Sequence, residues 1–445
     1  MDHRAALNRR LLFYTLYLAY ISAGIISILP GPALSLLAMH TGVPLDVAGW
    51  IFTTSASGFA IGVMIAGLLT AVLRPKHLLM IGMSLMASTG LITPLAYFFP
   101  SLLAVQFATG VGFGFLDVSI NITVALTFPD TLSETLNNLH SSYGVGALVA
   151  PLLLSLALEV THQAIWAFLA GSIAGLACIC LLARQYVPTT TKQVEKQPQQ
   201  GVSRSRSVFG QILLWFMALQ FFLYIAAEVG FSSWIVTAVS QSAAITIVLA
   251  APVATVFWLG LTLGRLISAQ VLKRALLSEN MLLSLCFIGG STSGLLVAIF
   301  PGQLAVSFGA SGLAGLFFGP VFPGLMAIAS RRFAHALGAV SSVLLISSGI
   351  AGMIAPALMG ILIPSFGINW VMAIPALSCL LITVPFSLAT RRQRRPLHSQ
   401  DDGHTMKEDA PLQQSERESP AIHPGDEAPF LVRERPGERT THVAA

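Results

Sequence analysis

The sequence predicts an all-α membrane protein in which twelve transmembrane helices form two parallel six-helix repeats. Two observations support this fold class: the composition is too apolar for a water-soluble domain, and the two halves share a pattern of small residues. The chain has 445 residues, of which 55% are hydrophobic and only 10% are charged, and its mean hydropathy is +0.77. A soluble domain carries roughly 25% charged residues, so most of these apolar side chains need lipid rather than a single protein core.

Twelve apolar runs each approach or exceed the roughly 20 residues that a helix needs to cross the hydrocarbon layer. They are predicted to be helices because an isolated strand in lipid leaves its backbone groups unpaired. The first run follows a basic N-terminus but is too long for a signal peptide, so we expect it to be the first span. The runs cover residues 11–38, 48–72, 78–98, 101–127, 135–157, 163–186, 209–239, 245–272, 281–299, 303–328, 337–363 and 367–389.

The two halves of the chain repeat the same small-residue pairs at an offset near 200 residues. Small residues four positions apart let helix backbones approach closely. Together with a polar segment between the halves, the repeat predicts an N-terminal bundle at 1–187, a cytosolic linker at 188–207, a C-terminal bundle at 208–390 and a disordered cytosolic tail at 391–445. The matched pairs are Gly58 and Gly62 with Gly260 and Gly264, Gly110 and Gly114 with Gly315 and Gly319, and the segments 144–151 and 349–356.

The basic residues of the loops predict the orientation. With twelve spans, the Lys and Arg residues outside the membrane fall on the side of the N-terminus, the linker and the tail, which the positive-inside rule assigns to the cytosol. The net charge of +5 is therefore a sign of topology and not of nucleic-acid binding. We expect a multi-pass protein of the plasma (inner) membrane with both termini cytosolic.

Few ionisable residues remain at membrane depth, and these are the first candidates for function. They are Asp117, Glu228, Arg265 and, near the start of its span, His140. A charge at the bilayer centre costs roughly 3 kcal/mol or more, so each must face the interior of the bundle. For Asp117 and Glu228 we favour a substrate or coupling-ion site over a structural ion pair. For Arg265, which lies close to the cytosolic end, we favour a structural ion pair or a gate.

Helical spacing places further polar groups beside the two carboxylates. Asn121 lies one turn after Asp117, and Tyr224 lies one turn before Glu228, so each pair shares a helix face. An aromatic face with amide, hydroxyl and carboxylate groups suits a sugar, because rings cover its C–H face and polar groups bond its hydroxyls. Core or lipid packing is the alternative for each aromatic side chain. The span of Glu228 also carries Gln220 and Trp234.

Three segments resemble the fucose permease and sugar:proton symporter branch of the major facilitators, to which the animal sodium-dependent glucose transporter-like proteins are similar. The segments are "DVSIN" (117–121), "LNNLHSSYGVGAL" (136–148) and "QFFLYIAAEVGFSSW" (220–234). The resemblance implies the major facilitator fold over about residues 10–390. Span one has no acid, unlike the fucose permease group, so either Asp117 acts alone in ion coupling or Glu228 supplies a second acid. The substrate contacts that the resemblance implies are Asn121, His140, Tyr143, Gln220, Tyr224, Glu228 and Trp234.

The sequence thus predicts a secondary active transporter of a small polar solute, in first place a monosaccharide, coupled to H+ or Na+ through Asp117. Multidrug or metabolite efflux is the alternative within this class, and a non-transporting receptor or scaffold of the same fold is the alternative outside it. No phosphate loop, nucleophile motif or metal-ligand spacing indicates an enzyme, a cofactor or a bound metal. The expected partners are the substrate, the coupling ion and the lipid bilayer, with a monomeric protein and no nucleic acid.

Overall fold

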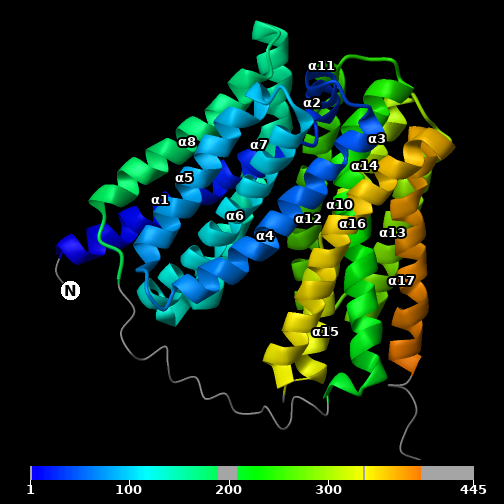
Figure 1. Ribbon diagram of the computed structural model, residues 1–445. Coiled ribbons are helices and arrows are strands. Elements are labelled where there is room, and N and C mark those ends of the chain that lie inside the picture. Colours follow the sequence, from blue (N-terminus) through cyan, green and yellow to red (C-terminus); the bar gives the residue numbers. More distant parts are fainter. Residues whose placement is uncertain (1–2, 189–207, 334–335, 392–445) are drawn as a thin grey trace, which may run out of the picture. The chain divides into compact units, whose positions relative to one another are not determined.

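The computed structural model is built of α-helices (Figure 1), and no strand occurs among the residues that it describes, which are 3–188, 208–333 and 336–391. The predicted linker and tail lie outside these ranges, apart from residues 188 and 391. Eleven helices in the described part of the chain are long and apolar enough to cross a membrane. The predicted all-helical membrane fold is therefore confirmed.

The packing partners of the helices repeat between the two halves. In the first half α1 packs on α7 and α8, while α4 and α5 pack on α6; in the second half α10 packs on α16 and α17, while α12 and α13 pack on α14. The helices of the first half are α1 (His3–Ile28), α2 (Leu34–Thr41), α3 (Leu45–Ala48), α4 (Trp50–Leu69), α5 (Pro75–Ile92), α6 (Phe99–Thr127), α7 (Leu132–Thr161) and α8 (Ile165–Arg184), with 3-10 turns η1 (Thr93–Leu95) and η2 (Pro129–Thr131). Those of the second half are α10 (Ile212–Ser242), α11 (Ile247–Ala250), α12 (Pro252–Lys273), α13 (Glu279–Ile299), α14 (Leu304–Phe318), α15 (Val321–Arg332), α16 (Leu337–Val371) and α17 (Ala373–Arg391).

The helices alternate in direction, so the loops gather at two ends of the bundles. We call the end that carries Arg74, Lys76, Lys273 and Arg331 the basic end, and the other the opposite end. At the basic end the Arg331 guanidinium forms an ion pair with Glu279, which ties α15 to α13. The twelfth span is α17, whose described apolar stretch is shorter than the other eleven spans.

Three of the predicted spans are interrupted at prolines, one of them being 245–272, where α11 ends at Ala250 and α12 begins at Pro252. The span predicted as continuous over 11–38 was wrong in this respect, because α1 ends before Pro30 and α2 begins only after Pro32. Proline has no N–H to donate to the preceding turn, and its ring clashes with the carbonyl four residues earlier. The span predicted over 303–328 is likewise divided between α14 and α15 at Pro320.

The repeated glycines lie where two helix backbones touch. A Cβ atom added at Gly58 or Gly62 of α4 would lie 2.0 or 2.5 Å from a backbone oxygen of α6. In the second half, a Cβ atom added at Gly260 or Gly264 of α12 would lie 2.2 or 2.1 Å from a backbone oxygen of α14. No side chain fits at these distances, so these glycines allow α4 to pack on α6 and α12 to pack on α14.

The two halves contact each other through α3 and α4 against α16, and through α7 against α11 and α12. Thr53 Oγ1 of α4 donates to the Met353 carbonyl of α16 over 2.5 Å, and Thr255 Oγ1 of α12 donates to the Leu148 carbonyl of α7 over 3.0 Å. The internal repeat relates these two bonds, because the donors are 202 residues apart and the acceptors 205. Each donor is the fourth residue of its helix, so both bonds lie towards the opposite end.

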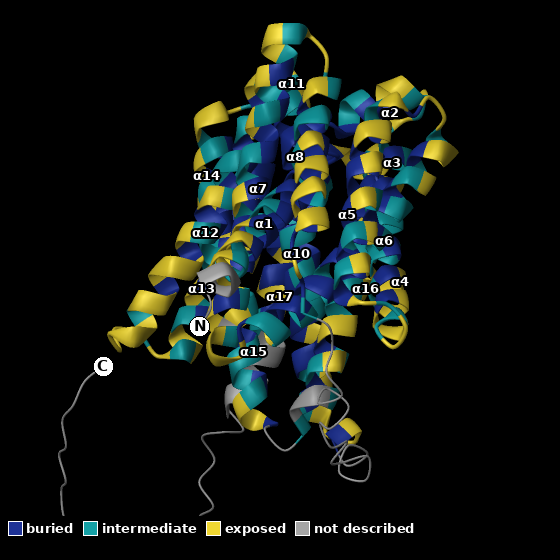
Figure 2. Ribbon diagram, turned by 90° about the vertical axis from the view of Figure 1, so that its left-hand side faces the viewer, coloured by how far each residue is buried: buried dark blue, intermediate teal, exposed yellow. Residues whose placement is uncertain are grey.

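The outward faces of the helices carry apolar side chains. On α8, Ile173 and Leu176 are exposed, whereas Phe168, Cys178 and Leu182 on the inward face are buried. Figure 2 shows such exposed residues along the front of α8. A continuous exposed apolar face marks a membrane contact, as expected for a multi-pass membrane protein.

We predict that Gly58→Ala destabilises the protein, because the added methyl group would lie 2.0 Å from the Phe107 carbonyl oxygen. Overpacking of this kind costs about 1–3 kcal/mol. Gly67→Ala is the matched control on the same helix, since a Cβ there meets nothing within 4 Å. The measurement is the unfolding temperature of each purified variant in one detergent. An unfolding temperature for Gly58→Ala equal to that of Gly67→Ala contradicts the close backbone contact.

Candidate functional site

Asp117 lies in α6 and is held by a tyrosine from α1. The Tyr20 hydroxyl donates a hydrogen bond to Asp117 Oδ1 over 2.7 Å. Asn121 shares the helix face of Asp117 as its spacing indicates, but its Nδ2 donates to the Asp117 backbone carbonyl over 2.7 Å and not to the carboxylate. Tyr20 is wholly buried and Asp117 is half-buried. The carboxylate is thus fixed from one side, while part of the Asp117 side chain stays accessible.

Two residues of α7 extend this cluster. The His140 ring lies 5.2 Å from the Tyr20 ring, centroid to centroid, in a tilted arrangement. The Tyr143 ring stacks on Phe113 of α6 at 5.4 Å. His140 is exposed and Tyr143 is half-buried, so α1, α6 and α7 together surround Asp117 with aromatic and titratable side chains.

A second carboxylate cluster lies on α10. The Tyr224 hydroxyl donates to Glu228 Oε2, one turn further along the same helix, and also lies 3.2 Å from the Phe318 carbonyl of α14. Gln220 is 2% exposed, and its Nε2 has no hydrogen-bond partner among the described residues. This cluster therefore contains one satisfied carboxylate–tyrosine pair and one buried amide donor without a hydrogen-bond partner among the described residues.

Arg265 of α12 lies near the second cluster without pairing with it. Its Nε donates weakly to the Gly319 carbonyl of α14, at 3.4 Å. Glu228 and Tyr224 lie within range of the Arg265 charge. Within the described residues no salt bridge joins Arg265 to Asp117 or to Glu228, and the Arg265 side chain is exposed. The guanidinium is therefore a near but unpaired cation beside this cluster.

Tyr143 lies near both carboxylate clusters. Its hydroxyl lies within range of the charges of both Glu228 and Asp117. The two carboxylates, which come from different halves of the chain, thus belong to one electrostatic environment.

Trp234 lies apart from this environment. It is wholly buried, and its Nε1 donates to the Pro356 carbonyl of α16 over 2.9 Å. A Cβ placed on Gly49 or on Gly360 would lie within 3.0 Å of the Trp234 ring. The ring thus fills the contact between the two halves at the opposite end, where a substrate does not reach it in this conformation.

Sequence reasoning missed Tyr20, the residue that binds Asp117. The internal repeat contained a signal for it, because Tyr20-Ile21 and Tyr224-Ile225 lie 204 residues apart, between the offsets of 202 and 205 that separate the other repeated pairs. Because Tyr224 was already a candidate site residue, the repeat could have predicted Tyr20 as a candidate as well.

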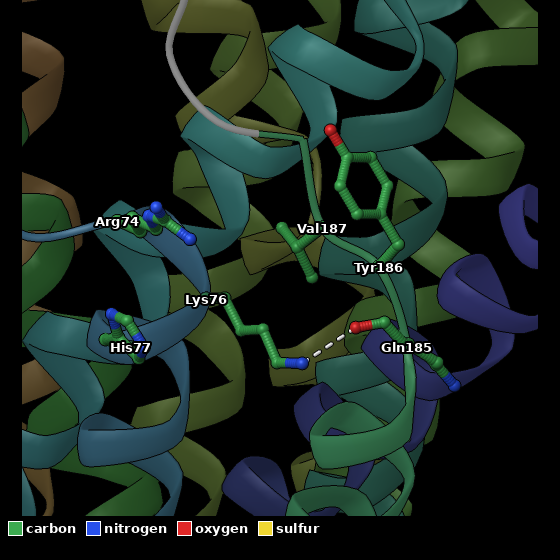
Figure 3. Close-up of a pocket in the computed structure, with 6 residues that line it drawn as sticks. All are labelled: Arg74, Lys76, His77, Gln185, Tyr186 and Val187. Atoms are coloured by element: carbon green, nitrogen blue, oxygen red, sulfur yellow. Dashed lines mark hydrogen bonds between the residues drawn. The ribbon is translucent and has the colours of Figure 1, made fainter.

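A separate pocket lies at the basic end, between the start of α5 and the residues that follow α8 (Figure 3). Lys76 Nζ donates to the backbone carbonyls of Gln185 and Ala183, over 2.8 and 3.0 Å. These bonds hold the C-terminus of α8 to α5, which is a structural role. In the part of the chain that the structure describes, no three His, Cys, Asp or Glu side chains are arranged to hold a metal ion. The pocket is lined by Arg74, Lys76, His77, Gln185, Tyr186 and Val187.

Comparison with known proteins agrees with this fold. The human sodium-dependent glucose transporter 1 is 24% identical over 445 residues, which span 90% of this chain and 84% of the relative. The 3-(3-hydroxy-phenyl)propionate transporter of Escherichia coli is 26% identical over 349 residues, with 72% of this chain and 83% of the relative covered. Among solved structures, the fucose:proton symporter of E. coli superposes with a TM-score of 0.57 at 19% identity, over 86% of this chain and 99% of the symporter.

The family model described as Major Facilitator Superfamily matches residues 16–309 and 280–431. This match covers far more than half of the sequence, and the relatives are transporters rather than enzymes. The chain therefore belongs to the Major Facilitator Superfamily of membrane transporters.

Proposed function

We propose that this transporter moves a monosaccharide across the plasma membrane by alternating access, coupled to H+ or Na+ through Asp117. The observation that carries the proposal is the pair of carboxylate–tyrosine hydrogen bonds, Tyr20 with Asp117 and Tyr224 with Glu228, set in a single electrostatic environment between the two halves. The name of the human relative, a sodium-dependent glucose transporter, supports the substrate class and leaves Na+ as a candidate coupling ion beside H+.

The proposed site offers the groups that a sugar needs. The unsatisfied Nε2 of Gln220 is a donor for a sugar hydroxyl, and the carboxylates are acceptors for others. The accessible rings of His140 and Tyr143 can cover an apolar sugar face. We assign Asn121 to orienting Asp117, because its amide holds the backbone at that residue.

The proposed cycle moves the bundles 1–187 and 208–390 against each other. In the conformation described here, the hydrogen bonds between the halves lie towards the opposite end. If the basic end is cytosolic, as the positive-inside rule predicts, this is an inward-facing state. We propose that Trp234 contacts substrate only after the halves separate at the opposite end.

An organic anion is the second candidate substrate. It is favoured by the exposed guanidinium of Arg265, which has no ionic partner among the described residues and lies within range of Glu228. The E. coli relative is named for a propionate, which carries a carboxylate. Guanidinium groups bind carboxylates bidentately, so Arg265 is the residue that would hold such a substrate.

We predict that proteoliposomes containing the protein accumulate radiolabelled D-glucose when an inward H+ or Na+ gradient is imposed. Asp117→Asn should abolish this accumulation and still exchange labelled for unlabelled D-glucose, because exchange needs no net movement of the ion. Measuring uptake and exchange on the same vesicles separates the two activities.

Gradient-driven accumulation by a folded Asp117→Asn variant excludes the coupling role of Asp117. If neither D-glucose nor 3-phenylpropionate moves in either direction under any gradient, the chain is better explained as a receptor or scaffold of this fold. Export without import points instead to an efflux transporter.

We predict that Glu228→Gln and Tyr224→Phe each weaken D-glucose binding about tenfold to a hundredfold, because a hydrogen bond to a charged group contributes about 1.5–3 kcal/mol. Tyr17→Phe is the matched control, since the Tyr17 ring packs on Phe13 at 4.7 Å and, among the described residues, its hydroxyl bonds to neither carboxylate. The measurement is D-glucose affinity by isothermal titration on the purified variants. Wild-type affinity in both test variants would place the substrate site elsewhere.

The proposed orientation is tested with single cysteines in a background that lacks the four native ones. Gln163 and Leu276 are both exposed, the first after α7 and the second after α12. We predict that a membrane-impermeant thiol reagent labels Gln163→Cys in intact cells and labels Leu276→Cys only after the cells are opened. The reverse pattern contradicts the assignment of the basic end to the cytosol.

A further inference from the structure

Tyr20 has a hydroxyl group that must be satisfied inside the protein. Its side chain is 0% exposed, so no bulk water reaches it, and a buried hydroxyl without a partner costs about 1–3 kcal/mol. The acceptor is Asp117 Oδ1, at 2.7 Å. This is a normal O–H···O distance, and such a bond is stronger when the carboxyl group is ionised than when it is protonated.

The groups around Asp117 leave Tyr20 as the donor to its carboxylate. On its own helix, the amide of Asn121 is used on the backbone carbonyl. From α7, His140 packs against the Tyr20 ring and the Tyr143 ring stacks on Phe113. Across the described part of the chain, no Lys or Arg forms a salt bridge with Asp117. Among the described residues, the Tyr20 hydroxyl is therefore the side-chain donor that bonds to the Asp117 carboxylate.

The second half of the chain uses the repeat-related tyrosine in the same way. Tyr224 lies 204 residues after Tyr20, on the helix that packs as α1 does, and its hydroxyl also donates to a carboxylate. The position of Glu228 corresponds, at the same offset, to Gly24. Both halves therefore have the tyrosine, but the acid that accepts its hydrogen bond comes from α6 in the first half and from the tyrosine's own helix, α10, in the second.

The packing of Gly24 explains this difference. A Cβ atom at Gly24 would lie 2.4 Å from the Tyr143 carbonyl oxygen, because α1 and α7 touch at this point. No acid can occupy that position in the first half. The carboxylate that meets the tyrosine comes instead from α6, as Asp117.

We propose that Tyr20 is the positioning residue of the coupling carboxylate: its hydroxyl bond stabilises the ionised form of Asp117 and thereby sets the pH at which Asp117 takes up a proton. This inference rests on the proposed coupling role of Asp117. Tyr20 keeps its own proton throughout. The proton that converts the carboxylate to a carboxylic acid comes from water on one side of the membrane, and it is released to water on the other side when the carboxylate forms again.

The test follows the infrared band of protonated carboxyl groups in lipid nanodiscs as the pH is varied, with no substrate present. The part of the band that disappears in Asp117→Asn belongs to Asp117. Tyr20→Phe removes the donor, so the ionised form loses stability, and the midpoint of the Asp117 band should move to higher pH by about one unit. Tyr17→Phe makes the same chemical change one turn earlier on α1 and should leave the midpoint in place.

A second variant should shift the midpoint of the Asp117 band in the opposite direction, and it preserves the shape of the side chain. Fluorotyrosine incorporated at position 20 is a stronger hydrogen-bond donor, so it should move the midpoint to lower pH. If Tyr20→Phe does not fold, the fluorotyrosine variant still tests whether the Tyr20 hydroxyl changes the midpoint of the Asp117 band. An unchanged midpoint in a folded Tyr20→Phe protein, or with fluorotyrosine at position 20, overturns the proposal, as does the absence of any Asp117 band that titrates.

A transport measurement separates this proposal from the proposed function. If Asp117→Asn loses gradient-driven D-glucose accumulation while the Tyr20 variants leave the midpoint unchanged, only the role of Tyr20 fails. If the Tyr20 variants shift the midpoint but Asp117→Asn still accumulates D-glucose, then Tyr20 tunes Asp117 and the coupling role of Asp117 fails.

Discussion

The hydrocarbon layer offers no water to a polar group, so each one in this chain must find its partner inside the protein. The backbone meets this requirement by remaining helical, and many hydroxyls meet it by binding a carbonyl of the preceding turn, as Ser119 and Ser311 do at 2.6 and 2.7 Å. A carboxylate has no proton to donate to a backbone carbonyl, so it needs a donor from another side chain. The pairing of Asp117 with Tyr20 and of Glu228 with Tyr224 follows from this constraint.

Duplication explains why the two halves share so much, and packing explains where they differ. The glycines that bring α4 onto α6 and α12 onto α14 are repeated, because each half must solve the same problem of backbone contact. An acid on the tyrosine-bearing helix is possible at Glu228 but not at Gly24, where the neighbouring backbone leaves no room. The electrostatic asymmetry between the halves therefore originates in the spacing of α1 and α7.

The sequence was sufficient to predict what depends on composition and local spacing. The helical membrane fold, the twin repeats and the shared face of Asp117 and Asn121 could all be derived in this way. The end of the first span at Pro30 was missed because a hydropathy run continues through a proline that the helix cannot accommodate. The Tyr20–Asp117 bond joins residues 97 positions apart, and the burial of Trp234 depends on glycines from two other elements. Such contacts depend on tertiary packing, which spacing along one helix does not contain.

Close backbone contacts at glycines recur within each half, whereas between the halves one is found at Gly360, where an added Cβ would lie 2.8 Å from the Asp46 carbonyl oxygen. This difference suits the proposed movement. Within each half, glycines bring whole backbones together, and such an interface cannot slide without clashes. Between the halves, single hydroxyls bond single carbonyls, as in Thr53 to Met353, Thr255 to Leu148 and Ser155 to Val248. Each such bond is worth only about 0.5–1.5 kcal/mol and can be exchanged for water when that end opens. The bundles can therefore move as rigid bodies, while the interface between them separates at modest cost and leaves the carboxylate–tyrosine pairs intact.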